Sequence, residues 1–291
     1  MIRVSGVSKS IHKNQILKDV HFSVKNGTVT GLVGRNGAGK TTLLRMIAGI
    51  LKPTNGEITV NDKNVFKQPS IKQNVVFVPD SADALKTYTI SEIVMFYKEI
   101  YQFNEEYFNQ LLEKFEFNKQ GKIKHFSKGQ KALFSLILAF STNAKYILLD
   151  EPTDGLDVII KKKILQFIAE EVAEKDVSVI ISSHRLDELE KMADHIIVLK
   201  QGRVDSEIEM EELKSQYRKI QVAFETSLPN YIREQSEVLS ESGRVAVLLI
   251  DSDDEKTDQL INDASPILYE DLPLTLEDIF IAKLGGELYV S

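Results

Sequence analysis

Runs of apolar residues alternate with amphipathic segments over the first two thirds of the chain. Five short runs of aliphatic and β-branched residues are typical of buried strands. They cover residues 28–33, 75–78, 146–149, 177–181 and 195–199. A helix is expected at residues 40–50, directly after the first run and a glycine-rich loop. This alternation of strands with helices predicts an α/β fold, with a parallel sheet whose strands are connected by crossover helices.

Two later parts of the chain depart from this alternation. Between residues 85 and 140, apolar side chains recur at helical spacing, as at Ile90, Ile93 and Tyr97, which predicts a helical subdomain inserted into the sheet. After residue 215, strand-like runs return, followed by an acidic loop and a helix. We therefore expect two domains, residues 1–215 and residues 216–291, the second a small α+β accessory domain.

Composition narrows the class of protein. The chain has 291 residues, no cysteine and a net charge of −7. The lack of cysteine excludes a disulfide scaffold, a thiolate metal site and a cysteine nucleophile. The negative charge argues against a general nucleic-acid binder, and no apolar run reaches the ~18 residues that cross a bilayer. From Gln216 onward there are 6 Lys/Arg against 15 Asp/Glu, which supports a domain boundary there.

A phosphate-binding loop follows the first predicted strand. Residues 34–42 read Gly-Arg-Asn-Gly-Ala-Gly-Lys-Thr-Thr and match the pattern G-x-x-x-x-G-K-[ST]. Its glycines let backbone N–H groups point toward an anion, and the start of the following helix adds its positive dipole end. The Lys40 ammonium is expected to contact the β- and γ-phosphates, and the Thr41 hydroxyl is expected to bind Mg²⁺. The nucleotide-binding candidates are Asn36, Gly37, Ala38, Gly39, Lys40, Thr41 and Thr42.

Two further predicted strands end in polar side chains. The run 146–149 is followed by Asp150 and Glu151, and the run 177–181 by two serines and His184. Asp150 is predicted to hold Mg²⁺, and Glu151 to activate or orient the attacking water. His184 is expected to contact the γ-phosphate and to hold Glu151 in place. A lone histidine at a strand end is more often structural, but its place after two nucleotide motifs favours the catalytic interpretation.

Taken in order, these motifs resemble those of the ATP-binding subunits of ABC transporters, over roughly residues 1–215. The most specific element is Phe126-Ser127-Lys128-Gly129-Gln130, which resembles the family signature L-S-G-G-Q in a degenerate form. The resemblance implies a P-loop core of the ABC type, with a mixed sheet. It also implies a head-to-tail dimer in which Ser127, Gly129 and Gln130 of one copy contact the ATP bound at Lys40 of the other.

Three positions depart from the family pattern. An aromatic residue that stacks on adenine is usual where this chain has Ile11, so His12 is an alternative base contact. The family places a glutamine where this chain has Asp80, which either serves as a third Mg²⁺ ligand or faces solvent as a turn residue. Lys128 replaces a glycine of the signature and is expected to add positive charge beside the phosphate.

The resemblance further implies a separate transmembrane permease as partner. The subunit would then lie on the cytoplasmic face of the membrane as a peripheral protein, and the helical segment would receive the permease. The tail resembles accessory domains of Gram-positive drug and peptide exporter ATPases. Within the family, the chain resembles the ATPases of exporters that expel amphipathic peptides, such as the phenol-soluble modulin exporter. Two alternatives stay open: a soluble ABC-type ATPase of translation or DNA repair, and a nucleotide-gated assembly module that does not hydrolyse ATP.

Overall fold

The computed structural model describes residues 1–81, 85–119 and 122–284. Contacts within the chain separate two compact units. The first contains Met1–His184 and Met192–Glu207, and the second contains Arg185–Lys191 and the chain from Ile208 onward. The division into folding domains at residue 215 stays a prediction, and the last seven residues of the expected second domain lie outside the described chain.

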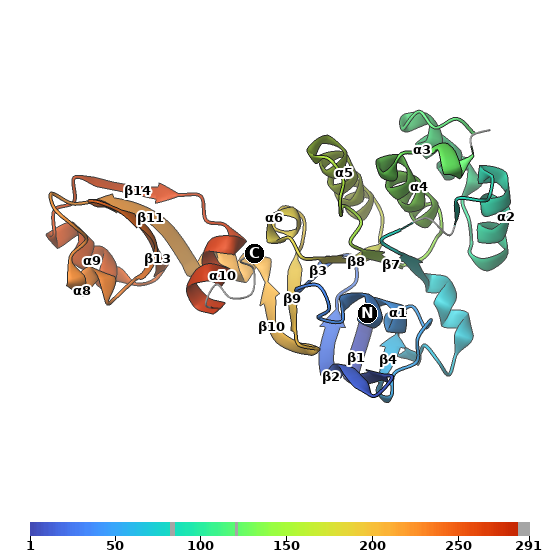
Figure 1. Ribbon diagram of the computed structural model, residues 1–291, viewed down its shortest axis with the longest axis horizontal. Coiled ribbons are helices and arrows are strands. Elements are labelled where there is room, and N and C mark those ends of the chain that lie inside the picture. Colours follow the sequence, from blue (N-terminus) through green and yellow to red (C-terminus); the bar gives the residue numbers. More distant parts are fainter. Residues whose placement is uncertain (82–84, 120–121, 285–291) are drawn as a thin grey trace. The chain divides into compact units, whose positions relative to one another are not determined.

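A six-stranded sheet forms the centre of the first unit (Figure 1). Its strands, in spatial order, are β10 (Arg203–Glu209), β9 (His195–Lys200), β3 (Val29–Val33), β8 (Ser178–Ser183), β7 (Tyr146–Asp150) and β6 (Val75–Val78). The pairs β9–β3, β3–β8, β8–β7 and β7–β6 are parallel. The predicted strands are confirmed, and because they are parallel their carboxyl ends meet at one edge of the sheet.

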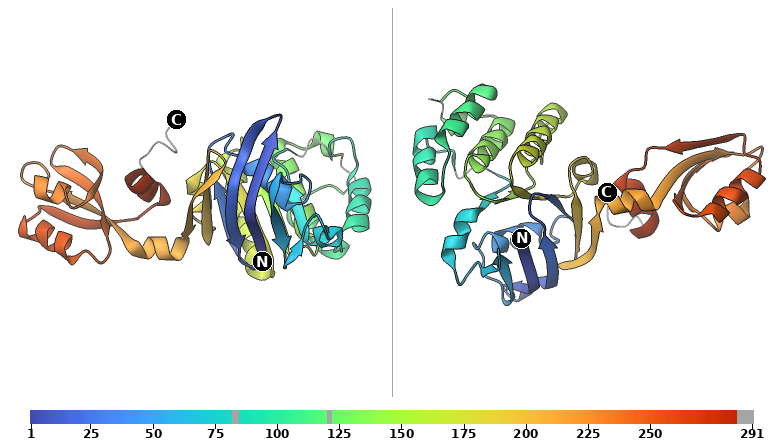
Figure 2. Two further views of the ribbon diagram at one scale, coloured as in Figure 1. Left: turned by 90° about the horizontal axis from the view of Figure 1, so that it is seen from below. Right: turned by 180° about the vertical axis from the view of Figure 1, so that it is seen from behind.

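An antiparallel sheet covers one face of this central sheet, with α1 between them (Figures 1 and 2). It consists of β2 (Asn14–Val24), β1 (Ile2–Ile11), β4 (Asn55–Val60) and β5 (Lys63–Asn64). The hydrophobic pattern did not indicate β1. Helix α1 (Lys40–Ile47) ends three residues before the predicted residue 50. Its buried Leu43 and Ile47 join side chains of both sheets in one core.

The other face of the central sheet carries helices (Figure 1). They are α2 (Ile90–Ile100), α3 (Glu105–Lys114), α4 (Lys128–Phe140) and α5 (Val158–Glu174), with the short 3₁₀ turn η3 (Ile123–His125). The 3₁₀ turn η1 (Pro69–Asn74) packs instead on the side of α1, where Ile71 joins the core. Thr89 and Glu92 form a capping box at the start of α2. Phe134 of α4 is fully buried and makes edge contacts with Phe108 and Phe126. The helical subdomain expected at residues 85–140 is therefore present.

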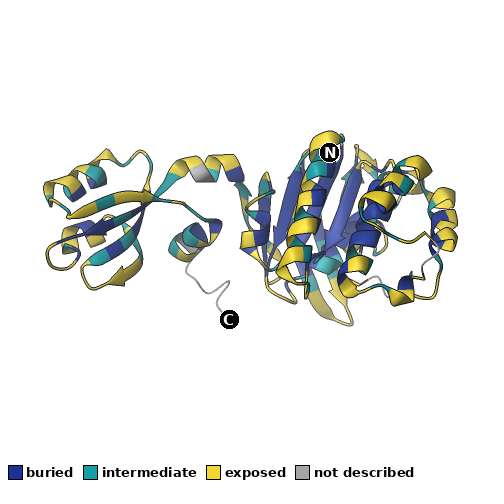
Figure 3. Cartoon of the chain, turned by 90° about the horizontal axis from the view of Figure 1, so that it is seen from above, coloured by how far each residue is buried: buried dark blue, intermediate teal, exposed yellow. Residues whose placement is uncertain are grey.

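The second unit is a small α+β structure, as predicted for the tail. Its antiparallel sheet has the order β12 (Glu237–Ser242), β13 (Val245–Asp251), β11 (Tyr217–Ala223) and β14 (Leu268–Leu272). The helices are α6 (Leu186–Leu189), α7 (Met210–Gln216), α8 (Asn230–Arg233), α9 (Glu255–Asp263) and α10 (Leu276–Leu284). Buried Ile220, Leu248 and Ile261 belong to its own hydrophobic core (Figure 3). The edge strands β12 and β14 were not apparent from the sequence.

Candidate functional site

The loop between β3 and α1 needs glycine for two physical reasons. A Cβ on Gly34 would lie 2.4 Å from the carbonyl oxygen of Leu199. Gly39 has φ +106° and would place a Cβ 2.7 Å from the side chain of Leu17. Gly39 is also the N-cap of α1 and offers no side chain to cap it. The first N–H groups of α1 are thus left for an external acceptor, which is the geometry of an anion site.

Lys40 is the buried cation of this loop, with its side chain only 6% exposed. Its Nζ donates to the carbonyl oxygen of Gly34 at 2.6 Å and lies 3.1 Å from Oε1 of Glu151. Glu151 follows β7 directly and has a φ of +46°, a left-handed conformation that costs non-glycine residues free energy. The strand end therefore holds the Glu151 carboxylate close to the phosphate loop.

Asp150 is buried at the end of β7 and accepts two hydroxyl hydrogen bonds. Thr41 Oγ1 donates to Oδ1 at 3.0 Å, and Ser182 Oγ donates to the same oxygen at 2.7 Å. Burial raises the pKa of Asp150, the two hydroxyl donors oppose that rise, and the negative charges of Asp80 and Glu151 add to it. Ser182 was not singled out from the sequence, although it belongs to the polar tip of the strand that ends at His184.

His184 lies on the opposite side of Glu151 from Lys40. Its Nδ1 is 2.9 Å from Oε2 of Glu151, so the carboxylate contacts Lys40 through one oxygen and the imidazole through the other. The His184 side chain is 37% exposed, and it therefore remains accessible to a ligand. Because β3, β8 and β7 are neighbouring parallel strands, the residues that follow them, Lys40, His184 and Glu151, come together at one edge of the sheet.

Lys40, Glu151 and His184 line one open cleft of about 470 Å³, here called the phosphate cleft, whereas Asp150 lies behind Thr41 and is not among its described wall residues. Its walls contain Ile16, Asn36, Gly37, Gly39, Lys40, Thr41, Thr42, Asp80, Glu151, Asp154 and His184. Most nucleotide-binding candidates lie together, and Ala38 is buried next to them without being part of the wall. Ile16 and Asp154 were missed by sequence reasoning. Ile16 precedes the buried Leu17, and Asp154 follows the two acids by only three residues.

The expected Mg²⁺ can be compared with the oxygen donors present. The Thr41 hydroxyl and the Asp150 carboxylate are adjacent hard oxygen ligands, which fit Mg²⁺ together with phosphate and water oxygens. Within the described chain, no group of three or more acidic or histidine side chains is placed to hold a metal ion. Asp80 lines the same cleft, and its role as a third ligand stays a prediction.

The signature residues are not part of this cleft. Ser127 caps α4 in a capping box, in which its Oγ accepts from the N–H of Gln130 and Gln130 Oε1 accepts from the N–H of Ser127. Gly129 is buried, and a Cβ there would lie 2.8 Å from Ile160. None of the three lines the described walls of the phosphate cleft. A single chain thus does not bring the signature to Lys40.

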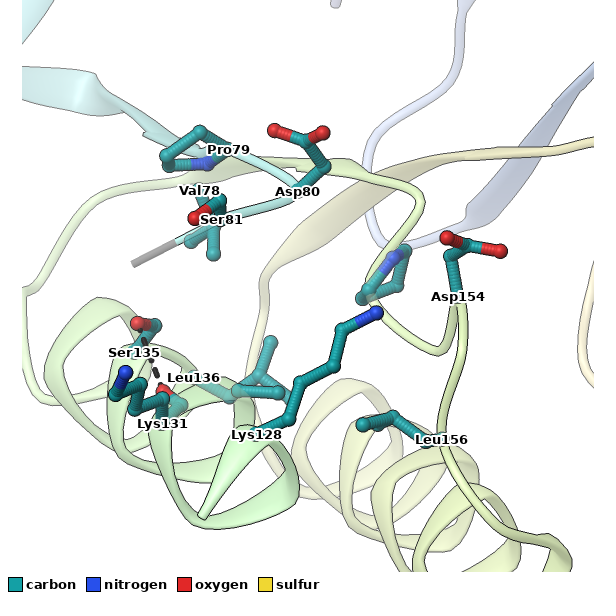
Figure 4. A pocket seen from close by; sticks show the side chains of 12 residues that line it. Val78, Pro79, Asp80, Ser81, Lys128, Lys131, Ser135, Leu136, Asp154 and Leu156 are labelled. Carbon is teal, nitrogen blue, oxygen red and sulfur yellow. Dashed lines mark hydrogen bonds between the residues drawn. The ribbon is translucent and has the colours of Figure 1, made fainter. Parts of the chain in front are cut away.

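Two other expectations stay predictions: the base contact near Ile11 or His12, and the positive charge of Lys128 beside a phosphate. Ile11 is 37% exposed, and among the described wall residues Ile16, rather than Ile11 or His12, contributes the apolar side chain. Lys128, next to Ser127, is exposed. Its side chain crosses a second cleft, between α4 and the loop after β7 (Figure 4).

The phosphate loop after a strand, the acid pair and the histidine define a P-loop nucleotide hydrolase. The sequence model described as "ABC transporter" matches residues 17–154. The chain is 38% identical over 289 residues, 99% of both chains, to the ABC transporter ATP-binding protein YtrB of Bacillus subtilis (strain 168). It is 30% identical over 223 residues to the bacitracin transport ATP-binding protein BcrA of Bacillus licheniformis, covering 75% of this chain and 73% of that one. The chain belongs to the ATP-binding proteins of ABC transporters.

Solved structures agree with this assignment. An ATP-binding subunit of an ABC transporter has a TM-score of 0.66 and 26% identity, over 74% of this chain and 92% of that one. A dimeric post-hydrolysis state of the ATP-binding cassette MJ0796, bound to ADP and phosphate, has a TM-score of 0.65 and 25% identity, over 72% and 99%. The protein is therefore an ATPase that binds ATP and acts in transport. No helix in the described part of the chain is long and apolar enough to cross a bilayer.

Proposed function

We propose that two copies of this chain close head to tail around two ATP molecules and thereby drive a separate transmembrane permease. Each ATP contacts Lys40 and Thr41 of one copy and Ser127, Gly129 and Gln130 of the other. Glu151 positions and deprotonates the attacking water, and His184 holds Glu151 and contacts the γ-phosphate. Thr41 and Asp150 would hold Mg²⁺, which would supply positive charge to neutralise the phosphates.

One observation carries the proposal. The phosphate cleft has a complete P-loop half, with Lys40, Glu151 and His184 in contact, whereas the signature residue Ser127 caps α4 outside it. Ser127, at the N-terminus of a 13-residue helix, presents a hydroxyl next to the N–H groups that favour an anion. A second copy is the simplest source of that half for the cleft of the first.

The test is the oligomeric state of Glu151→Gln in ATP, measured by sedimentation velocity. Glutamine keeps the shape of the side chain but cannot accept the proton of water, so ATP stays intact and the dimer accumulates. The double variant Glu151→Gln/Ser127→Arg places a bulky side chain at the interface and should remain monomeric while binding ATP. A Glu151→Gln protein that stays monomeric with ATP bound rejects the proposal.

An exposed apolar face on α2 supports a permease as partner. Met95, Phe96 and Ile100 are 62%, 54% and 53% exposed, although they lie on a helix whose other face is buried. Exposed apolar clusters of this kind are typical of protein interfaces. The triple substitution of these residues by serine should abolish co-purification with membranes that contain the permease and leave basal ATPase activity within twofold.

For the cargo, we propose export of drugs or amphipathic peptides from the cytoplasmic face of the membrane. The names of relatives support this class, since BcrA is a bacitracin transport protein and LnrL of Bacillus subtilis (strain 168) a linearmycin resistance protein. Phenol-soluble modulins remain one candidate within the class. Cells producing the chain and its permease should lose resistance to the exported peptide when Glu151→Gln replaces the parent.

A further inference from the structure

A second cleft of about 210 Å³ lies beside the phosphate cleft (Figure 4). It is bounded by the start of α4, by the segment after β6 and by the loop after β7, and two lysines and two aspartates lie in its wall: Lys128, Lys131, Asp80 and Asp154. Asp80 and Asp154 line the phosphate cleft as well. Their carboxylates therefore stand in the wall that the two clefts share.

The position of Lys128 is unfavourable for a cation within its own helix. It is the first residue of α4, where the helix dipole is positive and where a lysine is disfavoured. The first turn of α4 contains no acidic residue that would compensate. A compensating negative charge has to come from another element, and the nearest element across the cleft is the loop after β7.

The Lys128 side chain reaches that loop. A Cβ on Gly155 would lie 2.4 Å from Lys128 Nζ, so the ammonium covers the backbone next to Asp154. Figure 4 shows Lys128 extending across the cleft toward this loop, with Asp80 projecting from the segment after β6. Lys131 lies one turn further along α4 and has its own interaction partner.

Both aspartates belong to the wall of the phosphate cleft, so their charges act on an anion bound there. Asp80 is among the charges that raise the pKa of Asp150, so its field reaches the end of β7. Without a nearby positive charge, the carboxylates of Asp80 and Asp154 repel a triphosphate, because both are negatively charged. Asp80 and Lys128, two positions at which the chain departs from the family pattern, thus line the same cleft.

We propose that Lys128 is a positioning residue for ATP binding within its own chain: its ammonium offsets the carboxylates of Asp80 and Asp154 and so reduces their repulsion of the triphosphate. The ammonium lies over Gly155, next to Asp154 of the shared wall. Lys128 acts through the two aspartates and does not touch the nucleotide of its own chain.

The experiment is a mutant cycle on the full-length chain, read out as the affinity for a fluorescent ATP analogue in EDTA at low protein concentration. Lys128→Met removes the charge and keeps the length, and should weaken metal-free binding about fivefold at 50 mM salt. In the Asp80→Asn/Asp154→Asn background, the same substitution should change affinity less than twofold. The loss should shrink at 500 mM salt because the charges are screened.

Two controls separate charge from folding. Lys128→Arg should restore the parent affinity, and Lys131→Met removes an equal charge one turn away and should cost less than Lys128→Met. Thermal unfolding of each variant shows whether the fold is retained. An equal loss from Lys128→Met with and without the two aspartates, or no loss at all, overturns the proposal. Neither outcome touches the dimer proposal, which is measured separately with Glu151→Gln.

Discussion

Lys40 Nζ lies 3.1 Å from Oε1 of Glu151, and the two side chains are 6% and 16% exposed. The cation needed for the phosphates is therefore paired with the carboxylate assigned to water. We expect a triphosphate that enters the cleft to compete for Lys40 and to release that oxygen of Glu151. We therefore expect ATP binding and the activation of Glu151 to depend on the same event, the breaking of the Lys40–Glu151 ion pair.

The first prediction concerns this pair. Glu151→Gln should bind ATP about three- to tenfold more tightly than the parent, because the neutral amide competes less for Lys40, while hydrolysis falls by about 10²–10⁴. Equilibrium titration and phosphate release measure the two effects. His184→Ala is the matched control, since it removes the other contact of Glu151 and leaves the Lys40 pair intact. An unchanged affinity in Glu151→Gln would show that the pair does not oppose ATP.

The second prediction is the pH dependence of metal-supported hydrolysis. Asp150 holds a metal ion only when ionised, and burial raises its pKa, so protons compete with metal at a higher pH than for an ordinary aspartate. Ser182→Ala removes a hydroxyl that donates to the ionised form and so raises the pKa of Asp150 further. The acid limb of the rate profile should shift to higher pH in Ser182→Ala. Ser183→Ala, on the neighbouring residue, should leave the limb in place.

The third prediction concerns Asp80 and Mg²⁺. A carboxylate in the wall of the phosphate cleft repels ATP when the metal is absent and is neutralised when the metal is present. The ratio of ATP affinities with and without Mg²⁺ should therefore fall severalfold in Asp80→Gln. Calorimetric titrations of both proteins, in Mg²⁺ and in EDTA, measure this ratio. If the ratio is the same in both proteins, Asp80 behaves as a turn residue facing solvent.

The fourth prediction tests stability in the second unit. Lys219 Nζ donates to both carboxylate oxygens of Asp278 at 2.8 Å, and the side chains are 18% and 15% exposed. Burial alone would raise the pKa of Asp278, but hydrogen bonds from Lys219 and Thr275 outweigh it and lower the pKa. Asp278→Asn should destabilise this unit by about 1–3 kcal/mol, measured by hydrogen exchange in β11 and β13.

The sign of its pH dependence follows from the lowered pKa. The stabilisation by Asp278 is present above the pKa of the unfolded chain, about 3.8–3.9, and is lost as pH falls through the lower pKa of the folded chain. The difference between the parent and Asp278→Asn should thus be constant near neutral pH and disappear in strong acid. Asp253→Asn, in the loop before α9, provides a surface control whose effect should stay near zero.

Much of the ATPase site was predictable because its signals are local. The phosphate loop needs glycines at fixed spacing, and an apolar strand that ends in Asp150 and Glu151 presents acids at the edge of a parallel sheet. Strand β1 and the edge strands β12 and β14 were missed because their patterns are irregular or half exposed. Their strand state depends on pairing partners that lie far away in the sequence.

The sequence by itself determined the chemistry: which residue types bind phosphate, metal and water, and in which order they occur. Only the tertiary structure decided their partners. It paired Lys40 with Glu151, placed Asp80 and Asp154 in a wall shared by two clefts, and extended the exposed Lys128 over Gly155. The reason is physical, since a motif fixes side chains over a few residues, whereas the distance between charges on separate loops is set by how the sheet and helices pack.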